Sequence, residues 1–294
     1  MLMPLDTLEQ NLRQHVQQLA LEIGERNLLH PTALHAAEDY ITRCWQQQGY
    51  PIEKQAYRER DIPCANLEIS HTGTSRKDKI ILIGAHYDSV TGSPGANDNA
   101  SGVAVMLELS RLFRLKATAM TLRFVAFVNE EPPFFFTRRQ GSLIYAKAAR
   151  HRGDDICLML ALETMGYYRD EANSQGYPPL FRFFYPNQAN FISLVSNLRS
   201  RKLMHRLARA FRSSSDFPLQ HVATFSLIPG VAWSDHLSFW RQGYRALMVT
   251  DTAFYRYPYY HSAEDTAEKL DYGRLAQVCE GLFKAISLLA NEHL

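Results

Sequence analysis

The stretch from residue 84 to residue 102 concentrates side chains that can bind metal or move protons. It reads GAHYDSVTGSPGANDNASG and places His86, Asp88 and Asp98 directly after the apolar run Ile80–Ile83. Each residue alone has an ordinary structural explanation, because a lone histidine is more often hydrogen-bonded than metal-bound and Asp98 lies among turn formers. Imidazole nitrogen and carboxylate oxygen together are, however, ligands that zinc takes in proteins. The stretch predicts either a hydrogen-bonded turn or part of a metal site.

Further carboxylates stand at the ends of apolar runs. Glu130 and Glu131 lie side by side in FVAFVNEEPP, and Glu163 ends ICLMLALE. Unpaired charge is costly to bury at such a position, and a bound metal ion removes that cost. Adjacent side chains at a strand end point in different directions, so one glutamate can bind metal while the other faces substrate as a general base. This division of work favours metal-assisted hydrolysis.

A second imidazole and an orienting carboxylate fit the same kind of site. His261 in YPYYHSAEDT precedes Ser262, which we expect to be a helix N-cap with Asp265 three residues on. Asp88 follows His86 by two residues, so it can accept the other ring N–H of that histidine and fix its tautomer. The sequence thus offers two imidazoles, one of them with an orienting partner.

Two other motifs have competing explanations. WSDHLSFW contains Ser234, Asp235 and His236, but three successive residues are poorly arranged for a catalytic triad. We expect Ser234 to be a helix N-cap. The run PPFFFTRRQ, which follows the paired glutamates, predicts either a hydrophobic side-chain pocket at residues 134–136 or ordinary core packing.

The surrounding pattern predicts the elements that position these residues. Four short apolar runs lack period-two alternation, as expected of central strands covered on both faces. They span residues 79–86, 121–131, 156–163 and 246–251. Helical patterns span residues 5–48, divided near Pro31, and residues 101–113, 141–151, 190–212 and 270–292. This alternation indicates an α/β fold with an open, mostly parallel sheet flanked by helices.

The predicted strands share one property, because each ends in a residue able to bind metal or move protons. These residues are His86, Glu130 with Glu131, Glu163 and Asp251. In open α/β sheets, ligands bind in the crevice beyond the carboxyl ends of the strands, where loops from different strands converge. We therefore expect the polar strand ends to share one pocket.

Composition limits the classes of function. A chain of 294 residues with 46% hydrophobic and 21% charged residues is typical of a globular protein, and we expect one domain over residues 1–294, with N-terminal helices in residues 1–60 packed on it. The formal net charge is only +2, which argues against a nucleic-acid partner. The basic segment 199–212 has apolar residues at helical spacing and is better explained as a solvated amphipathic helix.

The cellular location is predicted from the patterns of membrane-spanning helices and export signals. No stretch approaches the roughly 18 apolar residues of a membrane-spanning helix, and the first 27 residues do not have the pattern of an export signal. We therefore expect a cytoplasmic protein with no membrane partner, unless a signal has been removed. The four cysteines are widely spaced, without a C-x-x-C pair, so buried thiols are expected.

Six motifs, AHYDS, GANDNASG, NEEPP, LALETMGY, WSDHLSFW and YYHSAEDTAEKLD, occur in one order between about residue 60 and the C-terminus. Together they resemble the co-catalytic zinc aminopeptidases of metallopeptidase family 28, which also contains the glutaminyl cyclases. The resemblance implies a three-layer α/β/α sandwich with a mostly parallel mixed central sheet. It also implies two zinc ions bridged by Asp98, with His86 and Glu163 completing one site and Glu131 and His261 the other.

The same resemblance implies roles for residues that do not bind metal. Glu130 would be the general base and Tyr260 would stabilise the oxyanion, while Asp88 and Asp235 would support the site. The family often has aspartate where Glu163 stands, and the peptide bond after the bridging aspartate is commonly cis.

The implied reaction is hydrolysis of the N-terminal peptide bond by a zinc-activated bridging water, on a peptide or amino-acid conjugate with a free N-terminus. The alternative is a single-zinc glutaminyl-peptide cyclotransferase, which forms N-terminal pyroglutamate. The cyclases carry tryptophan before the last histidine, whereas this chain has Tyr260, which favours the aminopeptidase. A binding module with a decayed site ranks last, because every required position is filled.

Overall fold

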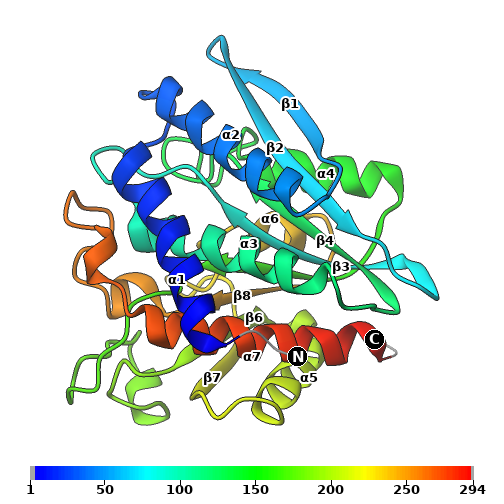
Figure 1. Ribbon diagram of the computed structural model, residues 1–294. Helices are drawn as coiled ribbons and strands as arrows, with labels where there is room; N and C mark the ends of the chain where they lie inside the picture. Colours follow the sequence, from blue (N-terminus) through cyan, green and yellow to red (C-terminus); the bar gives the residue numbers. More distant parts are fainter. Residues whose placement is uncertain (1–3, 293–294) are drawn as a thin grey trace.

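The computed structural model describes residues 4–292, which form an eight-stranded mixed sheet between two layers of helices (Figure 1). The strands are β1 (Glu53–Glu59), β2 (Ile62–His71), β3 (Arg76–His86), β4 (Met120–Phe127), β5 (Asp155–Glu163), β6 (Ile192–Asn197), β7 (Leu219–Thr224) and β8 (Ala246–Thr250). Their spatial order is β1-β2-β4-β3-β5-β8-β6-β7, with β4, β3, β5 and β8 parallel at the centre. The predicted α/β fold is confirmed.

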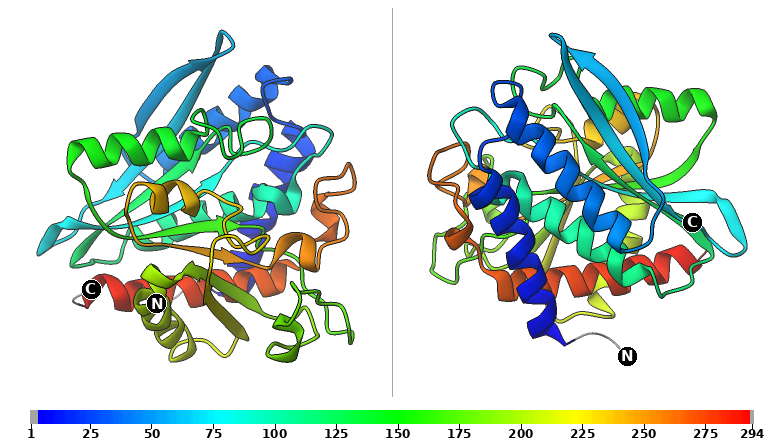
Figure 2. Two further views of the ribbon diagram at one scale, coloured as in Figure 1. Left: turned by 180° about the vertical axis from the view of Figure 1, so that it is seen from behind. Right: turned by 45° about the horizontal axis from the view of Figure 1, so that its top comes forward.

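The helices divide between the two faces of the sheet. They are α1 (Leu5–Val16), α2 (Pro31–Gln47), α3 (Gly102–Phe113), α4 (Gly141–Arg152), α5 (Arg201–Arg212), α6 (His236–Arg241) and α7 (Tyr272–Asn291), with a π-helical turn η1 (Gln17–Ile23) after α1. Figure 2 shows α4 and α6 in front of the sheet in its left panel and α1, α2, α3 and α7 in front in its right panel. Both faces of the central strands are therefore covered.

Burial on both faces explains the unbroken apolar runs of the central strands. In β3, Ile81 and Ile83 pack into the larger core beneath α3 and α7, while Ile80 and Leu82 pack into a second cluster with Tyr145 of α4. Alternate residues of the strand point to opposite faces, and here both faces are apolar. This arrangement fixes β3, and with it the position of His86 at its end.

One prediction of secondary structure is wrong. Residues 190–212 form strand β6 followed by α5 rather than one helix, because Leu194 and Val195 point to opposite sides and enter different apolar clusters. The helical pattern predicted over residues 5–48 is confirmed by α1, η1 and α2, whereas strand β1, which follows them, was not predicted. Positions 1–3 lie outside the described residues.

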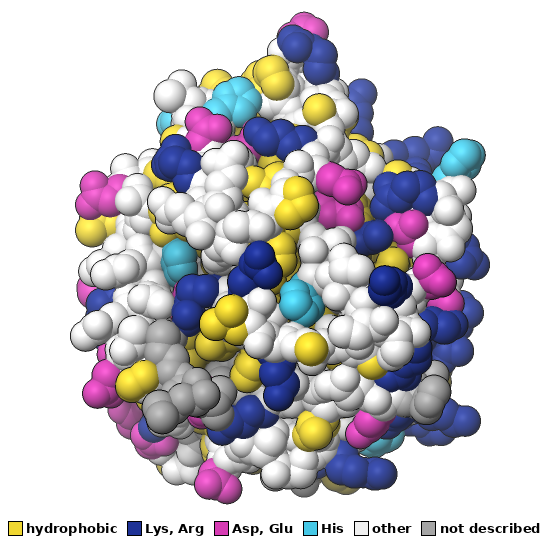
Figure 3. Space-filling view, turned by 45° about the vertical axis from the view of Figure 1, so that its right-hand side comes forward, with side chains coloured by type: hydrophobic (Ala, Val, Ile, Leu, Met, Phe, Trp, Pro, Cys, Tyr) yellow, Lys and Arg dark blue, Asp and Glu magenta, His cyan; other side chains and the backbone are white. Residues whose placement is uncertain are grey.

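The surface and the cysteines mostly follow the sequence expectations. Helix α5 buries Met204, Leu207 and Phe211 and exposes its basic side chains, as an amphipathic helix should. Figure 3 shows basic and acidic side chains interspersed over the face it presents. Cys64 and Cys279 are buried as expected, whereas two other cysteines are only partly buried. Among the described helices, none combines the length and apolar character required to cross a membrane.

Candidate active site

The predicted site residues converge beyond the carboxyl ends of the central parallel strands. His86 is the last residue of β3 and Glu163 the last residue of β5. Glu130 and Glu131 follow β4, which ends at Phe127 and is shorter than predicted. Asp98 lies in the irregular turn Ala96–Ser101 before α3, and its peptide bond to the next residue is cis.

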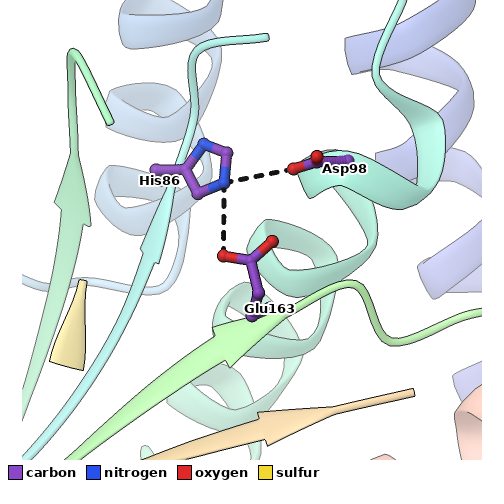
Figure 4. A group of neighbouring side chains, drawn as sticks. All are labelled: His86, Asp98 and Glu163. Carbon is purple, nitrogen blue, oxygen red and sulfur yellow. Dashed lines mark ion pairs between the residues drawn. The ribbon is translucent and has the colours of Figure 1, made fainter. Parts of the chain in front are cut away.

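Two clusters of potential metal ligands share Asp98. In the first, Nε2 of His86 lies 3.3 Å from Oδ1 of Asp98 and 3.4 Å from Oε2 of Glu163 (Figure 4). In the second, Nε2 of His261 lies 3.1 Å from Oδ2 of Asp98 and 3.3 Å from Oε2 of Glu131. Asp98 thus turns one carboxylate oxygen towards each cluster.

The buried polar atoms of the clusters fit bound zinc. Nε2 of His86, Oδ1 of Asp98 and Oε1 of Glu131 are buried without a hydrogen-bond partner in the described residues. Nδ1 of His86 lies 3.1 Å from the carbonyl oxygen of Asp88, which can only accept, so Nδ1 carries the hydrogen and Nε2 can offer a lone pair. Nitrogen and carboxylate donors around such atoms are the ligand set of zinc.

The electrostatics also favour a cation. Burial raises the pKa of Glu131 to about 8, with the Asp98 carboxylate adding to the effect. Burial likewise raises the pKa of Glu130 well above its ordinary value. Burial opposes the charge of His261, but Asp98 and Glu131 outweigh it and raise the pKa of His261 to about 10. Carboxylates crowded out of water share protons with the imidazoles, and a divalent cation would replace those protons.

Asp88 supports the site differently from the prediction. Its carboxylate accepts hydrogen bonds from the backbone N–H groups of Glu130 (3.2 Å) and Glu131 (3.1 Å). The ring N–H of His86 is directed to the Asp88 carbonyl, while the Asp88 carboxylate is 3.6 Å away. The side chain of Asp88 therefore fixes the paired glutamates, and its backbone fixes the histidine.

The WSDHLSFW motif contributes a hydrogen bond that the sequence did not reveal. Ser234, predicted as a helix N-cap, makes no capping hydrogen bond; its hydroxyl instead donates to Oε2 of Glu163 at 2.7 Å. Asp235 is buried beside the site, and burial raises its pKa to about 7. His236 donates from Nε2 to the carbonyl of Val231, so it has a structural contact and no triad forms.

Asp265 also differs from the prediction. The Ser262 N-cap is wrong, because the chain there forms turns and its hydroxyl donates to the carbonyl of Tyr259. Asp265 instead accepts the backbone N–H groups of Asn97 (2.8 Å) and Asp98 (3.1 Å). These contacts join residues more than 160 positions apart, and a capping motif in the local sequence could not reveal them.

Asp251 ends the last predicted strand but is not in either cluster. It accepts hydrogen bonds from the side chain of Asn97 (2.8 Å) and the backbone N–H groups of Tyr167 and Ala253 (both 2.9 Å). Asp251 therefore connects the loops that surround the site.

An apolar cavity lies beside the clusters. Glu163 and Tyr260 border it, and the Tyr260 ring stacks on His261 with 3.9 Å between ring centroids. Its wall includes the aromatic side chains of Tyr177, Phe181, Tyr185, Phe191, Trp233, Phe254 and Tyr255. Residues 134–136, the predicted candidates for a pocket, are not among its lining residues.

Comparisons with known proteins agree with this geometry. The family model described as "Peptidase family M28" matches residues 66–286. Over 291 residues, covering 96% of this chain and 88% of the relative, the chain is 35% identical to the uncharacterized protein YfbL of Escherichia coli K12. It is 27% identical over 261 residues to a probable leucine aminopeptidase of Trichophyton verrucosum, covering 83% of this chain but only 62% of that protein.

Solved structures share the fold. The zinc aminopeptidase BSAP from Bacillus subtilis has a TM-score of 0.75 at 15% identity, with 97% of this chain and 95% of that chain covered. The glutaminyl cyclase of Fimbriiglobus ruber has a TM-score of 0.73 at 19% identity, with 98% and 97% covered. At these identities the likeness is one of fold, and it includes both reaction classes.

Proposed function

Because the chain belongs to peptidase family M28, we propose that it is a zinc-dependent aminopeptidase that removes the N-terminal residue of peptides. The observation that carries this proposal is the pair of ligand clusters sharing Asp98. His86, Asp98 and Glu163 would hold one zinc ion, and Asp98, Glu131 and His261 would hold a second. Bound zinc would supply Lewis acidity, polarising the peptide carbonyl and lowering the pKa of water.

Glu130 is the proposed general base. It is buried beside the clusters, with Oε2 4.0 Å from Nε2 of His86, but it belongs to neither ligand set. Gln140 donates a long hydrogen bond of 3.4 Å to its Oε1, and Asp88 anchors its backbone N–H. The carboxylate of Glu130 takes a proton from the attacking water and returns it to the leaving amine.

Tyr260 and the apolar cavity are the proposed contacts with the substrate. Tyr260 precedes His261 and stacks on it, so its hydroxyl is a candidate donor to the oxygen that gains charge in the transition state. The aromatic cavity beside Glu163 suits a bulky apolar side chain on the N-terminal residue of the substrate. The proposed substrate is therefore a peptide with a free N-terminus and an apolar first residue.

The glutaminyl-peptide cyclotransferase remains the second candidate, and the fold likeness to glutaminyl cyclases supports it. The same ligands would serve with one zinc ion. Tyr260 stands where the cyclases carry tryptophan, which favours hydrolysis.

One experiment distinguishes the candidates. The zinc-loaded protein is incubated with peptides that begin with leucine or glutamine, each with a free or an acetylated N-terminus, and products are identified by mass. An aminopeptidase releases the first amino acid from the free leucine peptide and leaves the acetylated one intact. Equal cleavage of both forms contradicts exopeptidase action, and loss of ammonia from the glutamine peptide without cleavage identifies the cyclase.

A further inference from the structure

Arg26 is a fully buried cation with an unusual set of partners. It lies between η1 and α2, and its side chain is 0% exposed. In the described part of the chain, no carboxylate is within ion-pair distance of its guanidinium. Arginine is almost never fully buried unless it is paired, so this position requires an explanation.

Within the described residues, the guanidinium donates its hydrogen bonds to backbone carbonyls, and three of these carbonyls belong to one loop. Nε donates to the carbonyl of Tyr87 (2.7 Å), Nη1 to that of Pro94 (2.5 Å) and Nη2 to that of Gly95 (2.9 Å). This loop runs from His86, at the end of β3, to Asp98. The planar guanidinium thus joins the two ends of the loop that carries two of the proposed zinc ligands.

The backbone of Arg26 reinforces this contact at the middle of the loop. Its N–H donates to the hydroxyl of Ser89 (3.1 Å), and its carbonyl accepts from the N–H of Ser89 (2.9 Å). The packing leaves no spare room, since a Cβ at Gly95 would lie 2.4 Å from the Asp98 carbonyl and 3.3 Å from Nη2 of Arg26. Gly95 also has a φ of +61°, which glycine adopts without strain.

The guanidinium also hydrogen-bonds to the N-terminal helical layer, which consists of α1, η1 and α2 (residues 5–47). Nη1 also donates to the carbonyls of Gly24 (3.1 Å) and Leu19 (3.4 Å) at the end of η1. Leu19 is buried in the main core. Arg26 therefore connects the loop to a packed element that lies outside the segment matched by the family model, residues 66–286.

The charge of Arg26 suits a site rich in carboxylates. Burial lowers its pKa to about 10, while Asp265, Asp88 and Asp98 oppose the decrease. The guanidinium is therefore charged at neutral pH. Its field favours the ionised candidate ligands without occupying their oxygens, because no carboxylate oxygen of residues 4–292 is bound to it.

We propose that Arg26 is a positioning residue of the metal site, which holds His86 and Asp98 at the separation that both clusters require. It acts through the loop 87–95 and touches neither substrate nor metal. This inference rests on the proposed zinc site, and it predicts that Arg26 sets the affinity and geometry of that site.

The test is Arg26→Lys, which keeps the positive charge but replaces the planar five-donor fork with a single ammonium group. The variant should bind zinc roughly 10–100-fold more weakly, as supporting residues of metal sites do when mutated. Affinity is measured by competition with a chromophoric chelator, and ligand geometry by the visible absorption spectrum of the cobalt-substituted protein. The cobalt spectrum should change relative to the wild type.

Trp45→Phe is the matched control for lost stability. Trp45 is fully buried in the same N-terminal layer and bonds to Ser110 rather than to the loop. This change should lower the thermal midpoint while leaving zinc affinity and the cobalt spectrum unchanged.

The outcomes separate the inference from the proposed function. A folded Arg26→Lys variant with wild-type zinc affinity and cobalt spectrum overturns the inference. If that variant does not fold, Ser89→Ala is tested instead, because it removes the hydroxyl that accepts a hydrogen bond from the backbone N–H of Arg26. Weaker zinc binding by Ser89→Ala supports the inference, and unchanged binding overturns it. A wild-type protein that binds no zinc contradicts the proposed function instead.

Discussion

Glu130 and Glu131 are identical neighbours to which the proposed function gives different work. Glu131→Gln replaces an anionic ligand with a weak neutral one, so metal content at the cluster with His261 should fall. Glu130→Gln leaves both ligand clusters complete, so metal content should be unchanged. Turnover of Glu130→Gln should nevertheless fall by roughly 10²–10⁴-fold, the usual contribution of a positioned general base, with little change in KM.

Metal analysis, thermal midpoints and steady-state kinetics on both variants provide the check. If the two glutamates served only structural contacts, either change would lower stability and neither would separate metal content from rate. Near-normal turnover in Glu130→Gln would rule out the mechanism even with the fold intact.

Ser234 supports Glu163, and its removal should weaken that ligand. Ser234→Ala deletes the 2.7 Å hydrogen bond to Oε2 of Glu163. We expect zinc affinity to fall by roughly tenfold, since ligating carboxylates depend on such partners. Ser110→Ala removes a buried hydroxyl near the end of α3 that bonds to Gln48, and it should leave zinc affinity unchanged. Equal zinc affinity in both variants would mean that Ser234 does not tune Glu163.

At the residue scale, the sequence predicted the candidate ligands but not their supporting contacts. His86, Glu131 and Glu163 could be predicted as candidate ligands because they follow apolar strands, where a buried unpaired charge is improbable. The contacts of Ser234 and Asp265 join positions 71 and 168 residues apart, and only the folded chain brings them together. Local motifs therefore indicated helix caps at residues that support the proposed metal site.

At the scale of elements, strands buried on both faces were the easiest to predict. Strands β3, β5 and β8 lie close to their predicted limits, because continuous apolar runs between turns have few alternatives, and β4 begins where predicted but ends earlier. Strand β1 was missed because its residues are largely polar and exposed. The segment 190–200 was assigned to a helix because its apolar residues merge with the amphipathic pattern of α5.

The contact of α1 with α3 should depend on pH through His15. Nε2 of His15 lies 3.5 Å from Oε1 of Glu108. Burial opposes the charge on His15, but the neighbouring Cys44 and Glu108 outweigh it and raise its pKa from 6.5 to about 9. Burial alone would raise the pKa of Glu108, whereas His15 and Arg111 lower it from 4.5 to about 2.

These pKa shifts determine how the stability of the fold depends on pH. A raised histidine pKa adds stability that is complete below pH 6.5 and is lost as the pH rises through about 9. The lowered pKa of Glu108 adds stability above pH 4.5 that is lost as the pH falls towards 2. The pair therefore stabilises the fold most between about pH 4.5 and pH 6.5, where both contributions are complete.

His15→Gln tests this expectation. It should lower the free energy of unfolding by about 2 kcal/mol at pH 6 and by much less at pH 9.5, where wild-type His15 has lost most of its charge. Denaturant unfolding of both proteins at the two pH values measures the difference. A deficit that is the same at both pH values would mean that His15 contributes through packing alone.

At the scale of the whole molecule, the sheet brings ligands from distant segments to one edge. Residues 86, 98, 131, 163 and 261 meet there only when the strands are in register. Zinc that binds this assembled site and not the unfolded chain stabilises the fold, by about 4 kcal/mol when free zinc exceeds Kd by 1,000-fold. Metal binding and folding should therefore be linked.

Chelation tests this linkage. Exhaustive removal of metal should abolish peptide hydrolysis and lower the thermal midpoint, and added zinc or cobalt should restore both. Calorimetry and activity assays on the same samples measure the two effects. Activity that survives complete removal of metal would contradict the metal-dependent mechanism.

The most direct measurement is anomalous X-ray scattering at the zinc absorption edge from crystals equilibrated with saturating zinc. Two peaks roughly 3.5–4 Å apart are predicted, as in other two-metal hydrolytic sites. One should be bounded by His86, Asp98 and Glu163, and the other by Asp98, Glu131 and His261. A single fully occupied peak would favour the one-zinc cyclase, and the absence of any peak at Asp98 would contradict the proposed metal site.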